Sequence, residues 1–193
     1  LHLKGLVLDG KHGLQSGGSF SDGKLLLTDV EIRNFTSVAV LLSNQADTVM
    51  TSCYFHHSFK AISANNPNKV EIERSLFAFH DQTLMTISTT EDTQLVSLKN
   101  CTIAENAGIH VLGNAAVKIT GDAPAIVLIH NSFVDNNTEA VDVPTSTLLL
   151  GNLFARNIPY ASTTGESVSL VEGGLSGGSS SGYNLTDDEP AEL

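Results

Sequence analysis

The sequence predicts an all-β fold in which short strands are wound into stacked coils. Hydrophobic residues make up 41% of the 193 residues and charged residues only 16%, a balance that favours a folded domain with a continuous core. Gly, Ser, Thr, Asn, Val and Ile are plentiful, whereas long blocks of the helix formers Ala, Glu, Lys and Leu are missing. An apolar pattern that recurs along residues 1–157 indicates how the strands are arranged.

The segment 95–106 contains the clearest copy of this pattern. Val96 and Leu98 alternate with polar residues, as in a half-buried strand, and the next two residues, Lys99 and Asn100, break the alternation. The alternation starts again with Cys101 and Ile103. We therefore expect two short strands joined by a corner.

Seven segments align on the apolar position that Ile103 represents, at spacings of 21 to 30 residues. This position, the apolar column, is occupied by Leu8, Ile32, Phe55, Phe77, Ile103, Phe133 and Phe154. A third apolar pair follows in several segments: Val40 with Leu42, Ile109 with Val111, and Val141 with Val143. Three strands this short can bury their inward faces only by stacking on the next coil, at about 4.8 Å.

The expected corner lies three positions before the apolar column. Its residues are mostly types that tolerate bends: Gly5, Asp29, Ser52, Arg74, Asn100, His130 and Gly151. A bend at the same place in every segment would keep the coils in register.

This register resembles that of the right-handed, single-stranded parallel β-helix, the superfold of pectate lyases, phage tailspikes and many bacterial surface proteins. The resemblance covers residues 1–157 and implies about seven coils with three short strands each. A β-sandwich is the competing fold. The parallel β-helix is favoured because hairpin dipeptides such as Asn-Gly or Asp-Gly are missing between most of the strands, except at Asp9-Gly10 and Asp22-Gly23.

Two segments depart from the coil pattern. Residues 112–125 form an insertion in the fifth coil, where the alternation of Val117 and Ile119 predicts an extra strand projecting from the stack. The insertion is open to two interpretations, a binding face or a tolerated surface loop. Residues 158–193 contain one further strand-like run at 167–171, followed by a Gly- and Ser-rich stretch and an acidic end.

Charge and hydropathy limit the partners. A formal net charge of −11 disfavours nucleic acid and anionic membranes, and no apolar run is long enough to span a bilayer. The chain begins directly in strand-like sequence, which suggests an excerpt or a processed chain. We expect no cofactor, and from the resemblance a secreted or cell-surface location.

The two cysteines share an inward column with two asparagines, and three more asparagines form a second column. Cys53 and Cys101 are separated by the intervening coil, about 9.6 Å in all, which is too far for a disulfide, so two buried free thiols are predicted. Asn131 and Asn152 continue that column, and a second series stands three positions after the apolar column: Asn106, Asn136 and Asn157. These stacks predict asparagine ladders between coils, with a row of sugar-binding amides as the alternative.

Few residues suggest a metal-binding or catalytic role. His57, His80 and Asp81 are the candidates for a metal site, although consecutive His56 and His57 should point to opposite faces of a strand, and no metal site is predicted. His80 is also a weak catalytic candidate.

Glu105 and Asp135 form the other catalytic candidate. They share an outward column with Arg156, and adjacent coils would place the two carboxylates about 5 Å apart, as in retaining glycoside hydrolysis. An ion pair between Arg156 and Asp135 on a solvated face is the simpler interpretation.

The catalytic signatures of the β-helix enzymes are missing, because the chain lacks Trp and Arg-x-Pro-x-x-Arg as well as the polygalacturonase motifs. The first hypothesis is therefore a non-catalytic module of a larger bacterial protein, acting as stalk, adhesin or carbohydrate-contact surface. A polysaccharide lyase or glycoside hydrolase is the alternative. Polysaccharide or another surface protein would be the partner, and end-to-end self-association is a third hypothesis.

Overall fold

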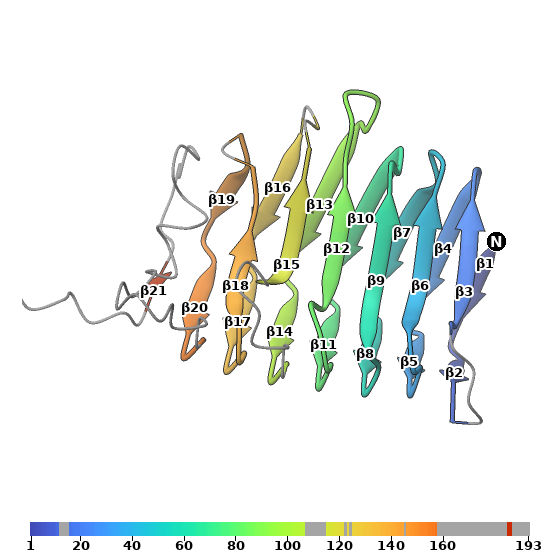
Figure 1. Cartoon of the computed structure of the whole chain (residues 1–193), viewed down its shortest axis with the longest axis horizontal. Helices are drawn as coiled ribbons and strands as arrows, with labels where there is room; N and C mark the ends of the chain where they lie inside the picture. The colour runs from blue at the N-terminus through green and yellow to red at the C-terminus, as the bar shows by residue number, and fades with distance from the viewer. Residues whose placement is uncertain are drawn as a thin grey trace, which may run out of the picture.

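The computed structural model describes residues 1–11, 16–106, 115–121, 123, 125–144, 146–157 and 185–186, and these form a stack of parallel coils. Six coils contribute three strands each, and β19 and β20 begin a seventh. Figure 1 shows the coils side by side along the long axis, from β1 at one end to β20 and β21 at the other. The described residues contain no helix, and hence none that could cross a membrane.

Three parallel sheets run along the stack. The first contains β1 (His2–Lys4), β4 (Lys24–Thr28), β7 (Asp47–Thr51), β10 (Lys69–Glu73), β13 (Leu95–Lys99), β16 (Ile126–Ile129) and β19 (Leu148–Leu150). The second contains β2 (Val7–Asp9), β5 (Glu31–Arg33), β8 (Tyr54–His56), β11 (Leu76–Ala78), β14 (Thr102–Ala104), β17 (Ser132–Val134), β20 (Leu153–Ala155) and β21 (Leu185–Thr186). The third contains β3 (Gly18–Ser21), β6 (Val38–Ser43), β9 (Lys60–Asn65), β12 (Met85–Ser88), β15 (Ala115–Thr120) and β18 (Glu139–Asp142).

The predicted register is confirmed in the core. The apolar column pairs residue for residue across the second sheet, Ile32 with Phe55, then Phe77, Ile103, Phe133 and Phe154. These six side chains are buried, and stacking brings the ring centroids of Phe55 and Phe77 to 4.9 Å. Each coil therefore buries its inward face against its neighbours, as the short strands require.

The corner before the second sheet is also confirmed. All seven residues at this position have a left-handed backbone, with φ between 49° and 62°. Five of them are not glycine, and the left-handed backbone costs each of these five about 1–2 kcal/mol. The next coil offsets part of that cost by accepting a hydrogen bond from the corner N–H, for example from Arg74 to the Lys99 carbonyl at 3.0 Å.

A second left-handed corner follows the second sheet, one position before the asparagine series of Asn106, Asn136 and Asn157. It consists of Asn34, His57, Phe79, Glu105, Asp135 and Arg156, with φ between 50° and 61°. Here the backbone turns from the second sheet toward the third, and the side chains of this column are presented on the outside of the turn.

Both asparagine ladders are present in the structure. Asn152 Oδ1 accepts hydrogen bonds from the backbone N and the Nδ2 of Asn131, at 2.9 and 3.0 Å, and Asn131 does the same for the backbone N of Cys101. The second ladder runs from Asn157 through Asn136 to Asn106. All five amides are buried, which confirms the structural interpretation over a sugar-binding row.

The fifth coil corrects one expectation. The strand that contains Val117 and Ile119 exists, but it does not project from the stack, because β15 lies in the third sheet and pairs with β12 and β18. The earlier pair, Ile109 and Val111, lies outside the described residues. The insertion therefore precedes the third strand of this coil, and the apolar alternation of Val117 and Ile119 reflects burial in the core.

Cys53 and Cys101 are buried free thiols, as predicted. Burial raises the pKa of both, that of Cys101 to about 11, so neither is a thiolate near neutral pH. The strand expected at 167–171 lies outside the described residues, whereas β21 extends the second sheet beyond β20.

The ladder yields a stability prediction. Replacing Asn136 with Ala removes an acceptor for the backbone N and Nδ2 of Asn106 and a donor to the Ile103 carbonyl, so that buried polar groups lose hydrogen bonds. We expect the free energy of unfolding to fall by about 2–4 kcal/mol in urea titrations. Asn65→Ala, at an exposed amide on the outer face, is the matched control, and an equal effect of both variants would contradict the ladder's role.

Candidate functional site

The two carboxylates of the predicted column, Glu105 and Asp135, have different surroundings. Arg156 binds Asp135 through two hydrogen bonds of 2.6 Å, and the guanidinium holds the pKa of that carboxyl below its usual value. The ion pair is confirmed. Its side chains are 65% and 42% exposed, so solvent and salt screen the pair and it contributes little to stability. Glu105, one coil earlier, is exposed at the same corner.

The candidate metal residues lie in different environments. His80 is fully buried in the ladder column, where its backbone N–H donates to Asn106 Oδ1 at 3.1 Å and its Nδ1 lies 3.0 Å from the Ser58 carbonyl. His57 is exposed at the second corner. The described residues contain no group of three or more His, Cys, Asp or Glu side chains that could hold a metal ion, so His57, His80 and Asp81 are not brought together as ligands.

The structure instead concentrates polar groups on the outer face of β2, β5 and β8. Arg33 lies between two carboxylates, with its Nε 2.9 Å from Asp9 and its Nη1 2.6 Å from Glu31. Glu31 also lies 3.1 Å from His56 Nε2, and Asn34 Nδ2 donates to Asp9 at 2.9 Å. We call these five residues, with His57, the polar network.

The network ends in a pair of histidines. His56 Nδ1 lies 2.6 Å from His57 Nδ1, despite the opposite directions expected of consecutive strand residues. The left-handed backbone of His57, at φ 50°, is what turns its ring back toward its neighbour. His56 stacks on Tyr54 at a centroid distance of 4.1 Å, and His57 stacks on Phe79 at 5.1 Å.

The network keeps its carboxylates ionised. The amide of Asn34, with help from Arg33, lowers the pKa of Asp9 to about 2. The His56 hydrogen bond, followed by Arg33, lowers the pKa of Glu31, and the two carboxylates together raise that of Arg33. The four charged or titratable side chains of Asp9, Glu31, Arg33 and His56 are 11–34% exposed. They therefore form a partly desolvated ion cluster on the outside of the stack.

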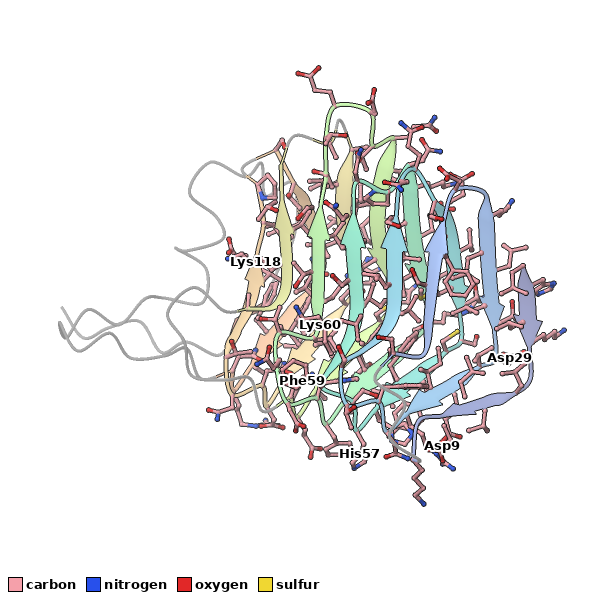
Figure 2. The ribbon with its side chains drawn as sticks, turned by 45° about the vertical axis from the view of Figure 1, so that its right-hand side comes forward. Asp9, Asp29, His57, Phe59, Lys60 and Lys118 are labelled. Atoms are coloured by element: carbon pink, nitrogen blue, oxygen red, sulfur yellow. The ribbon has the colours of Figure 1, made fainter. Side chains whose placement is uncertain are left out.

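A pocket of about 420 Å³ adjoins the network at the loops that follow β2, β5, β8 and β11. It is lined by Gly10, Lys11, Asn34, Phe35, Thr36, His57, Phe59 and Asp81. Figure 2 shows His57 and Asp9 along the lower edge of the molecule, with Phe59 above them. Phe59 is 37% exposed, so the pocket combines an accessible ring with charged, amide and hydroxyl groups.

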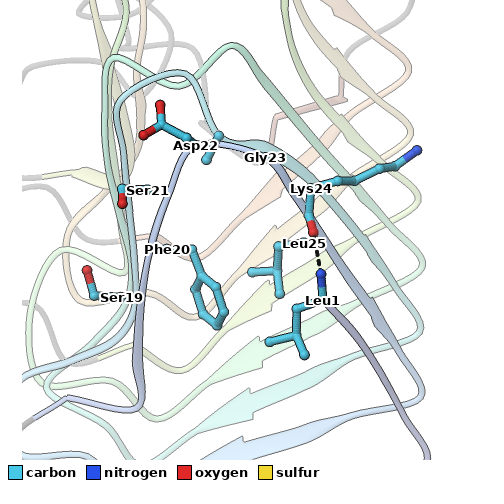
Figure 3. Close-up of a pocket in the computed structure, with 9 residues that line it drawn as sticks. Leu1, Ser19, Phe20, Ser21, Asp22, Gly23, Lys24 and Leu25 are labelled. Carbon is cyan, nitrogen blue, oxygen red and sulfur yellow. Dashed lines mark hydrogen bonds between the residues drawn. The ribbon is translucent and has the colours of Figure 1, made fainter.

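A second hollow, of about 400 Å³, lies at the end of the stack (Figure 3). Leu1, Phe20 and Leu25 line it, and the amino group of Leu1 donates to the Lys24 carbonyl at 2.7 Å. The rest of the lining consists of Ser19, Ser21, Asp22, Gly23, Lys24 and Ala46, and none of the lining residues belongs to the polar network. The pocket beside the polar network is therefore the better candidate functional site.

The comparisons with known proteins decide the family. The model of the right-handed β-helix region matches residues 12–174, most of the chain. The chain belongs to the right-handed β-helix family. No curated protein and no solved structure matches this β-helix, so its site must be interpreted from its own residues.

Sequence reasoning missed the polar network, although the signal was present in the register. Asp9, Arg33 and His56 each stand one position after the apolar column, and Glu31 stands one position before it. Equivalent outward positions on adjacent coils lie about 4.8 Å apart. The carboxylates, the guanidinium and the imidazole at these positions are therefore expected to lie within contact distance. The contact between His56 and His57 depends on a corner conformation that the pattern did not reveal.

His80 generates a prediction about pH. Burial lowers its pKa from 6.5 to about 4, so the folded β-helix favours the neutral ring more than the unfolded chain does. This contribution to stability is fully present above pH 6.5 and is lost as the pH falls toward 4, about 3 kcal/mol in all.

His80→Asn should remove this pH dependence. The amide would take the place of the ring in the ladder between Ser58 and Asn106 without a titrating group. Urea unfolding at pH 4.5 and 7 should show a smaller difference for the variant than for the wild type. His130→Asn, at an exposed corner histidine, is the control, and an unchanged difference in His80→Asn would refute the assignment.

Proposed function

We propose that this right-handed β-helix is a secreted or cell-surface module of a larger protein that contacts carbohydrate through the pocket beside the polar network. The observation that carries the proposal is the lining of the pocket, which offers Lys11, Asn34, Thr36 and Asp81 around the exposed ring of Phe59. Sugars present hydroxyl groups that both donate and accept hydrogen bonds, and C–H faces that pack on aromatic rings. The lining supplies partners for both.

The charges favour binding over catalysis in this proposal. Asp9, Arg33 and Glu31 satisfy one another within the network, which makes it a rigid support for the pocket wall formed by Asn34 and His57. The net charge of −11 disfavours strongly acidic polymers. Neutral oligosaccharides are therefore the expected ligands, and the stack serves as the scaffold that presents them with a fixed surface.

One observation favours the enzymatic alternative, a polysaccharide lyase or glycoside hydrolase. His57 lines the pocket with His56 and then Glu31 behind it, an order of groups suited to general acid–base chemistry. Incubation with polygalacturonate, alginate and xylan separates the two functions. Unsaturated products or new reducing ends that disappear in His57→Gln would establish the enzyme in place of the binding module.

The binding function is tested with xyloglucan oligosaccharides, cellohexaose and polygalacturonate by isothermal titration calorimetry. We expect binding of a neutral probe that weakens at least about tenfold in Phe59→Ala, because a stacking surface is lost, and also in Asp81→Asn, because an ionised acceptor is lost. Leu153→Ala, an equally exposed apolar residue on the outer face of β20, should bind like the wild type. Binding that survives both pocket substitutions, or no binding of any probe, would contradict the proposal.

A further inference from the structure

The contact between His56 and His57 constrains how many protons the pair can hold. Two ring nitrogens 2.6 Å apart can form a hydrogen bond only if one carries a proton and the other a lone pair. Two lone pairs or two N–H groups at this distance would repel each other. The geometry therefore fixes one proton between the rings.

Glu31 fixes a second proton. Its ionised carboxylate lies 3.1 Å from His56 Nε2, so that nitrogen is the donor. The contact can then exist in two charge states. In the neutral state, His57 Nδ1–H donates to the lone pair of His56 Nδ1. In the state with one added proton, that proton lies on His57 Nε2 and the proton of His57 Nδ1 has passed to His56 Nδ1. His56 then carries a proton on both nitrogens and donates to the lone pair of His57 Nδ1.

A further proton breaks the contact. With both rings protonated, two N–H groups would face each other at Nδ1, and the two positive charges would add to the repulsion. His56 is held by Glu31 and by its stacking on Tyr54, and its side chain is only 11% exposed. His57 is the exposed partner, so its ring is the one that moves.

The groups around the pair act on these two steps in opposite ways. Glu31 on β5 and Asp9 on β2 favour added protons, as does Asp81 across the pocket. Arg33 on β5 and Lys11 after β2 oppose them, and His80 of the next coil stays neutral because it is buried. Glu31 is the group in direct contact, so it stabilises the first added proton most.

Movement of His57 reaches the pocket directly. Its ring forms part of the pocket lining and stacks on Phe79 at 5.1 Å. We propose that His56 and His57 form a two-step proton switch, which keeps the pocket in the form described here until the second proton releases His57 and changes the pocket wall. The effect on ligand rests on the proposed function, whereas the switch itself does not.

The switch is tested on the full chain without ligand, by ¹⁵N and ¹H NMR of the histidine rings and of Phe79 between pH 4 and 8. We expect His56 and His57 to titrate in two coupled steps, with the ring-current shifts of Phe79 changing only in the second, more acidic step. Two independent steps, or Phe79 signals that do not follow the second step, would overturn the proposal.

Two variants assign the steps. Glu31→Gln removes the carboxylate that holds His56 and should lower the proton affinity of the first step about tenfold. The control is Glu71→Gln, a glutamate of similar exposure paired with Lys69 on the first sheet, and it should leave both steps unchanged. His57→Gln should leave His56 with a single step and Phe79 with none. Unchanged titration in Glu31→Gln would refute the assignment.

The two proposals fail in distinguishable ways. Calorimetry with cellohexaose and xyloglucan oligosaccharides, repeated on either side of the second step, should show at least a fivefold change in affinity. If the NMR steps are present but no probe binds at either pH, only the carbohydrate proposal falls. If a probe binds while the coupled steps are absent, only the switch falls.

Discussion

Parallel hydrogen bonding between successive coils is the interaction on which the rest of this structure depends. It sets neighbouring strands at about 4.8 Å and makes residues at equivalent positions meet, whether they face the core or the solvent. The stacked rings of Phe55 and Phe77 inside and the ion cluster of Asp9, Arg33 and Glu31 outside follow from the same register. Core and candidate site are thus two faces of one periodic arrangement.

The corners have the same backbone conformation in successive coils but carry different side chains. Five different non-glycine side chains accept a left-handed backbone before the second sheet, and six do so after it. Part of the backbone cost is offset along the stack, because corner N–H groups such as those of Asp29, Arg74 and Asp135 donate to a carbonyl of the next coil. What differs from coil to coil is the side chain carried outward, and at His57 that side chain reaches the neighbouring ring and the pocket.

Much of the fold could be predicted from sequence because the inward residues repeat. Ile103 and its equivalents, the first corner and both asparagine ladders were all found from spacing alone, since each rests on contacts between equivalent positions. The third strand of coil five was misplaced because Val117 and Ile119 follow a long insertion that shifts them out of the common spacing. His57 shows the limit for the site, since only the three-dimensional turn tells which way its ring points.

The ladders also give the stack a direction. Asn131 Oδ1 accepts the backbone N–H of Cys101 in the preceding coil, and Asn152 in turn serves Asn131. Each coil therefore depends on its successor for the acceptor of a buried backbone N–H. The successor in turn depends on the preceding coil for an acceptor of its side-chain amide, as when Asn131 Nδ2 donates to the Leu98 carbonyl at 3.0 Å. Loss of the following coil would remove the acceptor of a backbone N–H such as that of Cys101, whereas loss of the preceding coil would remove a carbonyl acceptor from the Nδ2 of Asn131. During synthesis, each new coil of the ladder supplies the Oδ1 acceptor for a buried backbone N–H of the coil before it. The hydrogen bonds of a ladder coil are therefore complete only after the next coil has formed.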